Sequence, residues 1–331
     1  MNKTLIAIAV LAASGAVSAQ VSLTGKLGFS YQKNATAAGG AANHGMQMTD
    51  GDLNFAATED LGGGSKITAS SAFVSRGRDT GITARDASLV LSTRAAAYTF
   101  GSIEKCSRID NVAGAPVSLA TGHDGTSTPL AAGKFSLDDS CVNVDTAGVA
   151  VPLGPVTVSA SYNEVGAGAG SGAAASNNAT FYTLAADYAA GPLALGLEVR
   201  QAQVAVTGAA FTAAKFHDGL TTTRLTGSYD FGAVKVGAGV ETSNHNAPNK
   251  FTVSLAAPVS SAATVGLIHS NRSAVTADAT YFNASVDALT ATAVGVDYKL
   301  SKLTTLNASY GTYNNTAVNG NEYRIRLMKA F

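Results

Sequence analysis

Hydrophobic and polar residues alternate one by one along most of the chain after residue 20. In the first such stretch, Val21, Leu23, Leu27, Phe29 and Tyr31 share one parity, and the positions between them are mostly polar. Successive side chains of a β-strand point to opposite faces, so a period of two predicts a strand with one apolar and one polar face. The pattern recurs to the last residue, which predicts an all-β protein.

Sixteen such stretches are predicted, and most are about ten residues long, which is the length that a tilted strand needs to cross a bilayer. Short turns such as Gly191-Pro192 alternate with longer Gly-, Ala-, Ser- and Asn-rich connections such as 34–45 and 166–178. Outer-membrane barrels have short turns at one rim and long loops at the other. The strands are predicted over 21–31, 46–59, 65–75, 84–93, 96–104, 140–151, 156–164, 179–189, 193–206, 221–231, 234–243, 249–257, 262–271, 289–300, 303–314 and 321–331.

These features together predict a 16-stranded antiparallel transmembrane β-barrel. A soluble β-sandwich also alternates, but its strands average about five or six residues and its polar face would carry many charges. Charged residues make up 13% of this chain, about half the usual quarter. After the first 19 residues there is no run of 18 apolar residues, so no transmembrane helix is predicted.

The first 19 residues have the pattern of a secretory signal peptide. A positive start at Lys3 precedes an apolar run from Leu5 to Ala13, and small residues at Val17-Ser18-Ala19 form a cleavage site. A membrane anchor is the alternative, but the apolar run is too short to span about 30 Å of hydrocarbon. We therefore predict a signal peptide over 1–19 and a single barrel domain over 20–331.

The charge and the histidines exclude several other classes of function. The formal net charge is zero, without the basic excess of a nucleic-acid-binding protein. The five histidines are scattered without metal-ligand spacing, so neither a metal nor a cofactor is expected. A barrel enzyme such as an outer-membrane lipase needs a nucleophile and a histidine on the lipid face. His269 has that parity but no serine partner can be named, so the chain is not expected to be an enzyme. An adhesin barrel is a further alternative.

Several motifs resemble one known family. The turn sequence 58–64 (TEDLGGG), the strand 85–91 (RDASLVL) and the hairpin formed by 297–302 (DYKLSK) and 308–311 (ASYG) are similar to segments of the general trimeric porins of β-proteobacteria and neisseriae. The terminal Phe331 resembles the aromatic end that the outer-membrane assembly machinery reads. In order and spacing, these pieces cover the whole chain after the signal peptide.

The resemblance implies a homotrimer in the outer membrane of a Gram-negative bacterium, in contact with lipid and lipopolysaccharide. It implies passive diffusion of ions and small hydrophilic solutes through a water-filled channel. It also implies that the third external loop, here about 105–139, folds into the lumen and narrows it. A substrate-specific channel is the alternative within this class.

The parity of the strands predicts which charges line the pore. Charges on wall and loop would create a transverse field that orients permeating dipoles, whereas the alternative is that most of them merely solvate a wide lumen. Cys106 and Cys141 bracket the loop and would be able to form a disulfide in an oxidising compartment, the alternative being two free thiols. The predicted pore-lining bases are Lys26, Arg200, Arg224, Lys235, Arg324 and Arg326, and the charged loop residues are Arg108, Asp110, Asp124, Asp138 and Asp139.

The chain departs from the family pattern at two places. Where the family has a basic pore residue before the turn at 58–64, this chain has Asp52 and Ala56, and where a strand usually ends in Gly-Arg it has Gly101-Ser102. The anion preference common in the family loses its basis at these positions. We therefore predict weak ion selectivity.

Overall fold

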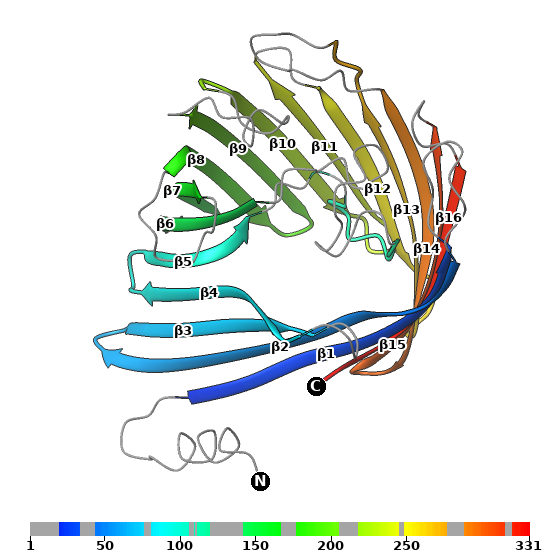
Figure 1. Cartoon of the computed structure of the whole chain (residues 1–331), viewed down its shortest axis with the longest axis horizontal. Coiled ribbons are helices and arrows are strands. Elements are labelled where there is room, and N and C mark those ends of the chain that lie inside the picture. The colour runs from blue at the N-terminus through cyan, green and yellow to red at the C-terminus, as the bar shows by residue number, and fades with distance from the viewer. Residues whose placement is uncertain are drawn as a thin grey trace.

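The computed structural model describes residues 20–33, 44–75, 81–105, 109, 111–119, 142–166, 177–204, 218–244, 248–276, 288–314 and 320–331. They form a closed barrel of sixteen antiparallel strands that pair in chain order (Figure 1). The strands are β1 (Gln20–Lys33), β2 (His44–Gly62), β3 (Ser65–Val74), β4 (Thr83–Ser92), β5 (Ala97–Lys105), β6 (Val142–Leu153), β7 (Val156–Gly166), β8 (Asn177–Ala190), β9 (Leu193–Val204), β10 (Thr221–Asp230), β11 (Lys235–Ser243), β12 (Lys250–Pro258), β13 (Ala263–Arg272), β14 (Leu289–Ser301), β15 (Thr304–Asn314) and β16 (Gly320–Ala330). The predicted fold class is confirmed, and the predicted strand limits agree within a few residues.

The two ends of the chain close the barrel. β1 pairs with β16 from Lys26 opposite Ala330 to Lys33 opposite Tyr323. Beyond this ladder, the Gly25 and Phe331 backbones exchange two hydrogen bonds of 3.0 Å. Closure leaves no strand edge unpaired, which is what a sheet in hydrocarbon requires, because lipid cannot satisfy backbone N–H and C=O groups.

The outer face of the wall is apolar, as the alternation predicts. Aromatic rings gather toward both rims: Tyr31 stacks on Tyr323 at the rim of the long loops, with a centroid separation of 6.3 Å, and Tyr229 lies against Phe231 near a short turn, at 4.6 Å. Such rings favour the two membrane–water interfaces. Among the described residues, no helix is long and apolar enough to cross a membrane. The exposed apolar side chains between the rims include Leu27, Leu184, Leu195, Leu197, Leu225, Val294, Ile325 and Leu327.

The described part of the connection between β5 and β6 lies inside the barrel. In Figure 1, the short teal piece of chain at residues 111–119 runs inside the ring of strands, beside the wall formed by β11 to β15. We call residues 111–119 the inner segment. The prediction that the third loop folds inward is confirmed for this part of it.

Candidate functional site: the lumen and its inner segment

A first row of alternating charges crosses the inner wall from β16 through β1, β2 and β4 to β5. Asp50 accepts ion pairs from Arg326 at 3.2 Å and from Lys26 at 2.9 Å. Asp52 lies 3.1 Å from the same lysine. Arg85 lies 3.8 Å from Asp52 and 3.3 Å from a carboxylate oxygen of β5. We call this row the first charge belt; its members are Arg326, Asp50, Lys26, Asp52, Arg85 and Glu104.

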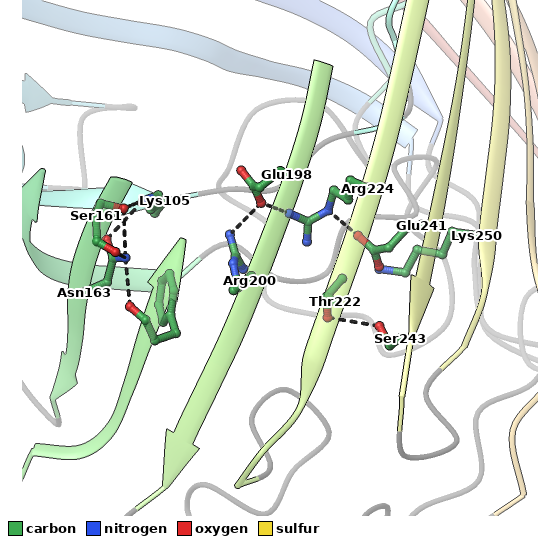
Figure 2. Close-up of polar contacts among 11 residues, drawn as sticks. Lys105, Ser161, Asn163, Glu198, Arg200, Thr222, Arg224, Glu241, Ser243 and Lys250 are labelled. Atoms are coloured by element: carbon green, nitrogen blue, oxygen red, sulfur yellow. Dashed lines mark hydrogen bonds and ion pairs between the residues drawn. The ribbon is translucent and has the colours of Figure 1, made fainter. Parts of the chain in front are cut away.

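A second row of alternating charges runs across β9 to β12 (Figure 2). Arg224 is its centre, because its guanidinium donates to Glu198 on one side and to Glu241 on the other. The Lys250 ammonium lies 2.9 Å from Glu241, and the Arg200 guanidinium lies 3.8 Å from Glu198. We call these five residues the second charge belt.

Both belts alternate in sign, so each carboxylate lies between two cations except Glu104, which ends the first belt beside Arg85. The first belt has three cations and three anions, and the second has three cations and two anions. Opposite charges a few ångströms apart largely cancel each other's field at a distance. A permeating ion therefore passes side chains of both charges, and the net charge of the belts is small.

Lys105, at the end of β5, lies between the two belts, and its hydrogen-bond partners are uncharged side chains. Its ammonium donates to Ser161 at 2.6 Å and to Asn163 at 3.1 Å, and it lies 5.8 Å from the centre of the Phe181 ring. The Arg200 guanidinium lies 4.6 Å from the same ring. Both distances fall within the roughly 6 Å at which a cation and an aromatic ring attract each other. Figure 2 shows this group at the end of the second belt.

A cavity of about 550 Å³ joins the two belts inside the barrel. Arg85 and Glu104 of the first belt line one side of it, and Glu198 and Arg224 of the second belt line another. Its remaining lining includes the carboxylate of Asp187. Because charged and polar side chains make up most of this lining, with Leu197 the one bulky apolar residue in it, the space is suited to water and hydrated solutes.

The inner segment is fixed to the wall at β12 and β15 by hydrogen bonds. The Ala113 N–H donates to Ser254 Oγ at 2.8 Å, and the Ser118 N–H donates to Ser309 Oγ at 2.8 Å. The Asn307 amide donates to the carbonyl of Pro116, also at 2.8 Å. These wall residues belong to β12 and β15, so the segment is bonded to the wall at points along its length.

Glycines on the inner wall make room for the segment. A Cβ atom at Gly295 would lie 2.2 Å from the Pro116 carbonyl oxygen, and one at Gly237 would lie 2.5 Å from the Ala113 nitrogen. Real Cβ atoms do not approach backbone atoms so closely, so only glycine permits this contact. We call the inward-facing glycines whose Cβ positions lie within 3.0 Å of Ile109 or of the inner segment the glycine seat: Gly237, Gly239, Gly266, Gly295 and Gly311. At Gly266 and Gly311 the segment atoms that a Cβ would meet belong to side chains.

An apolar cluster completes the contact between segment and wall. Val117 and Leu119 of the segment pack with Ile268 and Leu289 of the wall. Burial of a side chain of this size stabilises by about 1.5–3 kcal/mol. The segment presents no charge to the lumen, because none of residues 111–119 is ionisable. In the described part of the channel, the charges therefore come from the wall alone.

The predicted pore-lining bases lie in different environments. Lys26, Arg200, Arg224 and Arg326 are members of the belts, and Lys235 begins β11 at the short-turn rim. Arg324 differs, because it is only 1% exposed. Its guanidinium donates to Gln32 at 2.9 Å and to Ser118 of the inner segment at 3.2 Å. Arg324 faces inward, but it lies beneath the segment and is not open to the water of the lumen.

The charged loop residues Arg108, Asp110, Asp124, Asp138 and Asp139 lie outside the described residues, and so do Cys106, Cys141 and the signal peptide 1–19. The field between wall bases and loop acids stays a prediction. Mass spectrometry of non-reduced peptides tests the disulfide, and two alkylatable thiols would refute it.

Sequence reasoning missed several residues of the site. Asp50, Arg85, Glu104 and Lys250 were not singled out as pore residues, although each joins a belt. Alternation alone assigns Lys250 to the inner face, so parity was a sufficient signal for it. The signal for the glycine seat was the recurrence of inward-facing glycines in neighbouring strands.

The barrel has counterparts among known proteins. A family model described as Gram-negative porin matches residues 4–318. No curated protein sequence matches. The chain is similar in structure to an anion-selective porin from Comamonas acidovorans, with 17% identity, a TM-score of 0.66, and coverage of 95% of this chain and 100% of that one.

Two further solved structures are similar. A loop L8 deletion mutant of OmpT, an outer membrane protein of Vibrio cholerae, shares 16% identity with a TM-score of 0.65, over 95% of this chain and 100% of that one. A mutant of the porin of Rh. blastica shares 13% identity with a TM-score of 0.63, over 94% and 100% of the two chains. At such identities the likeness supports the fold.

Proposed function

The chain belongs to the family of Gram-negative porins, which are outer-membrane channels for the passive diffusion of ions and solutes, and from this premise we propose that its channel is a general pore with weak ion selectivity. The observation that carries the proposal is the pairing of opposite charges in both belts. Asp52 is central, because it lies within ion-pair distance of Lys26 and Arg85 and so offsets their charge. An acid at this place removes the cationic excess that an anion-selective wall requires.

Reversal potentials in a planar bilayer under a gradient of KCl test this selectivity. Because opposite charges are paired in the belts, the expected ratio of K⁺ to Cl⁻ permeability is within about twofold of one at 0.1 M salt. At this ionic strength the Debye length is about 10 Å. A ratio far above or below this range would refute the proposal. The structurally similar porin from Comamonas acidovorans is described as anion-selective, so the proposal predicts that the two channels differ in this ratio.

A substrate-specific channel is the second candidate within the family. The cavity between the belts, with Arg85, Asp187 and Glu198 in its lining, offers groups that would bind a polar solute. Liposome swelling separates the two functions. A general pore passes neutral sugars in the order of their size without competition, whereas a specific channel saturates and is blocked by its own substrate.

We further propose that the protein assembles as a homotrimer, that Phe331 is read by the assembly machinery, and that lipid and lipopolysaccharide surround the barrel. Family membership and the apolar outer face support these proposals. Channel closure in three equal conductance steps is the expected outcome for a trimer in a planar bilayer. A single step with the mass of one chain in detergent would refute the trimer.

A further inference from the structure

The inner segment and the wall beneath it are complementary in a way that the general function of a pore does not require. The backbone of the segment lies against places where the wall has no side chain, and Arg324 connects the segment to β1 and β16. We propose that the glycine seat and Arg324 hold the inner segment as a fixed part of the pore lining and so set the width of the channel at this level. The proposal rests on the proposed function as a conducting channel.

The first argument is steric. The Cβ positions of Gly295 and Gly237 lie within 2.5 Å of backbone atoms of the segment. Backbone atoms cannot rotate away as the end of a side chain can. A side chain at either position therefore moves the segment away from the wall, and the only open direction is toward the axis of the lumen.

The second argument is the burial and bonding of Arg324. Its Nε donates to Gln32 of β1 at 2.9 Å, and one terminal nitrogen donates to Ser118 Oγ at 3.2 Å. A guanidinium presents donors in a rigid fork, whereas an ammonium is a single point charge. Arg324 thus acts through Ser118 and is a positioning residue of the constriction.

The third argument is that the seat is confined to the wall beneath the segment. At Gly227, on β10, the nearest atom to the Cβ position is the end of the Leu195 side chain at 3.1 Å, and the nearest backbone atom, the Ala194 carbonyl oxygen, is at 3.9 Å. Glycines of the seat instead face inward on β11, β13, β14 and β15. Gly227 therefore provides a matched control, because Gly227→Ala adds the same methyl group to a strand without reaching the segment.

The steric test is the single-channel conductance of Gly295→Ala in 1 M KCl, where fixed charges are screened. Displacement of the segment toward the axis is expected to lower the conductance by about a quarter or more, while Gly227→Ala stays within about a tenth of the native channel. An unchanged or larger conductance in Gly295→Ala would overturn the proposal.

The bonding test is hydrogen exchange of the peptide that contains 111–119, followed by mass spectrometry in the folded barrel. Arg324→Ala is expected to speed exchange of this peptide by about tenfold, with the peptides of the strands unchanged. Ser118→Ala should have a similar effect, and the double variant should add little to either. Additive effects of the two changes would show that Arg324 does not act through Ser118.

Arg324→Lys separates position from charge. A lysine keeps the charge, but its single ammonium cannot donate to Gln32 and Ser118 at once. Hydrogen exchange at 111–119 should therefore still become faster, while the permeability ratio stays native. Native exchange in Arg324→Lys would overturn the role of the fork. Absence of conductance in the native protein would instead refute the proposed function, so the two failures are distinguishable.

Discussion

Replacement of Arg224 by alanine is expected to shift the ion selectivity of the channel toward cations at low salt. This arginine is the centre of the second charge belt, where it contacts Glu198 and Glu241 at once. Its removal leaves Glu198 with Arg200 at 3.8 Å and Glu241 with Lys250 at 2.9 Å. The second belt then falls from three cations and two anions to two of each, which is a loss of one positive charge beside the cavity.

The size of the effect follows from Coulomb's law. A unit charge about 5 Å from a passing ion in water contributes about 0.8 kcal/mol, and screening at 0.1 M salt reduces this to about 0.5 kcal/mol. Cations gain this free energy and anions lose it, so the ratio of cation to anion permeability rises by up to about fivefold. At 1 M salt the Debye length is about 3 Å and the expected change is below about twofold.

The assay is the reversal potential of single channels in a salt gradient, measured at both ionic strengths. Arg224→Lys keeps the charge and should retain the native ratio. Lys302→Ala removes one cation from the short turn between β14 and β15, away from the cavity, and should leave the ratio unchanged. A native ratio for Arg224→Ala at 0.1 M, or an equal shift in the turn variant, would refute the reasoning.

Three further predictions follow from the wall. Glu241→Gln removes an anion from the second belt, so reversal potentials at 0.1 M should shift toward anions by a similar factor. Leu225 and Thr226 are neighbours on opposite faces of β10. Leu225→Arg places a charge on the lipid face and should lower the free energy of unfolding by about 2–4 kcal/mol, whereas Thr226→Arg should lower it by much less. Urea titrations of the barrel in liposomes measure both. Deletion of Phe331 removes both hydrogen bonds with Gly25, so heat-modifiable migration in gels should show less folded protein.

The alternation of residues predicted the wall well, because side-chain direction in a strand is a local property. Leu27 and Leu225 lie on the outer face, as the alternation predicts, and Lys26 and Arg224 take part in ion pairs on the other face. Such parity needs no knowledge of the partner strand. It persists along each strand wherever no bulge interrupts it.

Which charges meet could not be predicted, because register is a long-range property. The ladder between β1 and β2 shifts at Gly28/Phe29, and the ladder between β3 and β4 shifts at Ser71/Phe73. Such irregularities decide which side chains of neighbouring strands lie within ion-pair distance. The burial of Arg324 depends in turn on a segment that arrives from the distant connection after β5.

The pairing of β1 with β16 also constrains how the protein is made. In this ladder Lys26 lies opposite Ala330, so the pairing joins residues near the start of the barrel to residues near its end. No order of synthesis from the N-terminus lets this contact form early, and contacts of such sequence separation are slow to form. Until then, β1 and β16 carry open edges that would pair with other chains. We therefore expect the exported polypeptide to depend on a chaperone that shields these edges until its last strand has arrived.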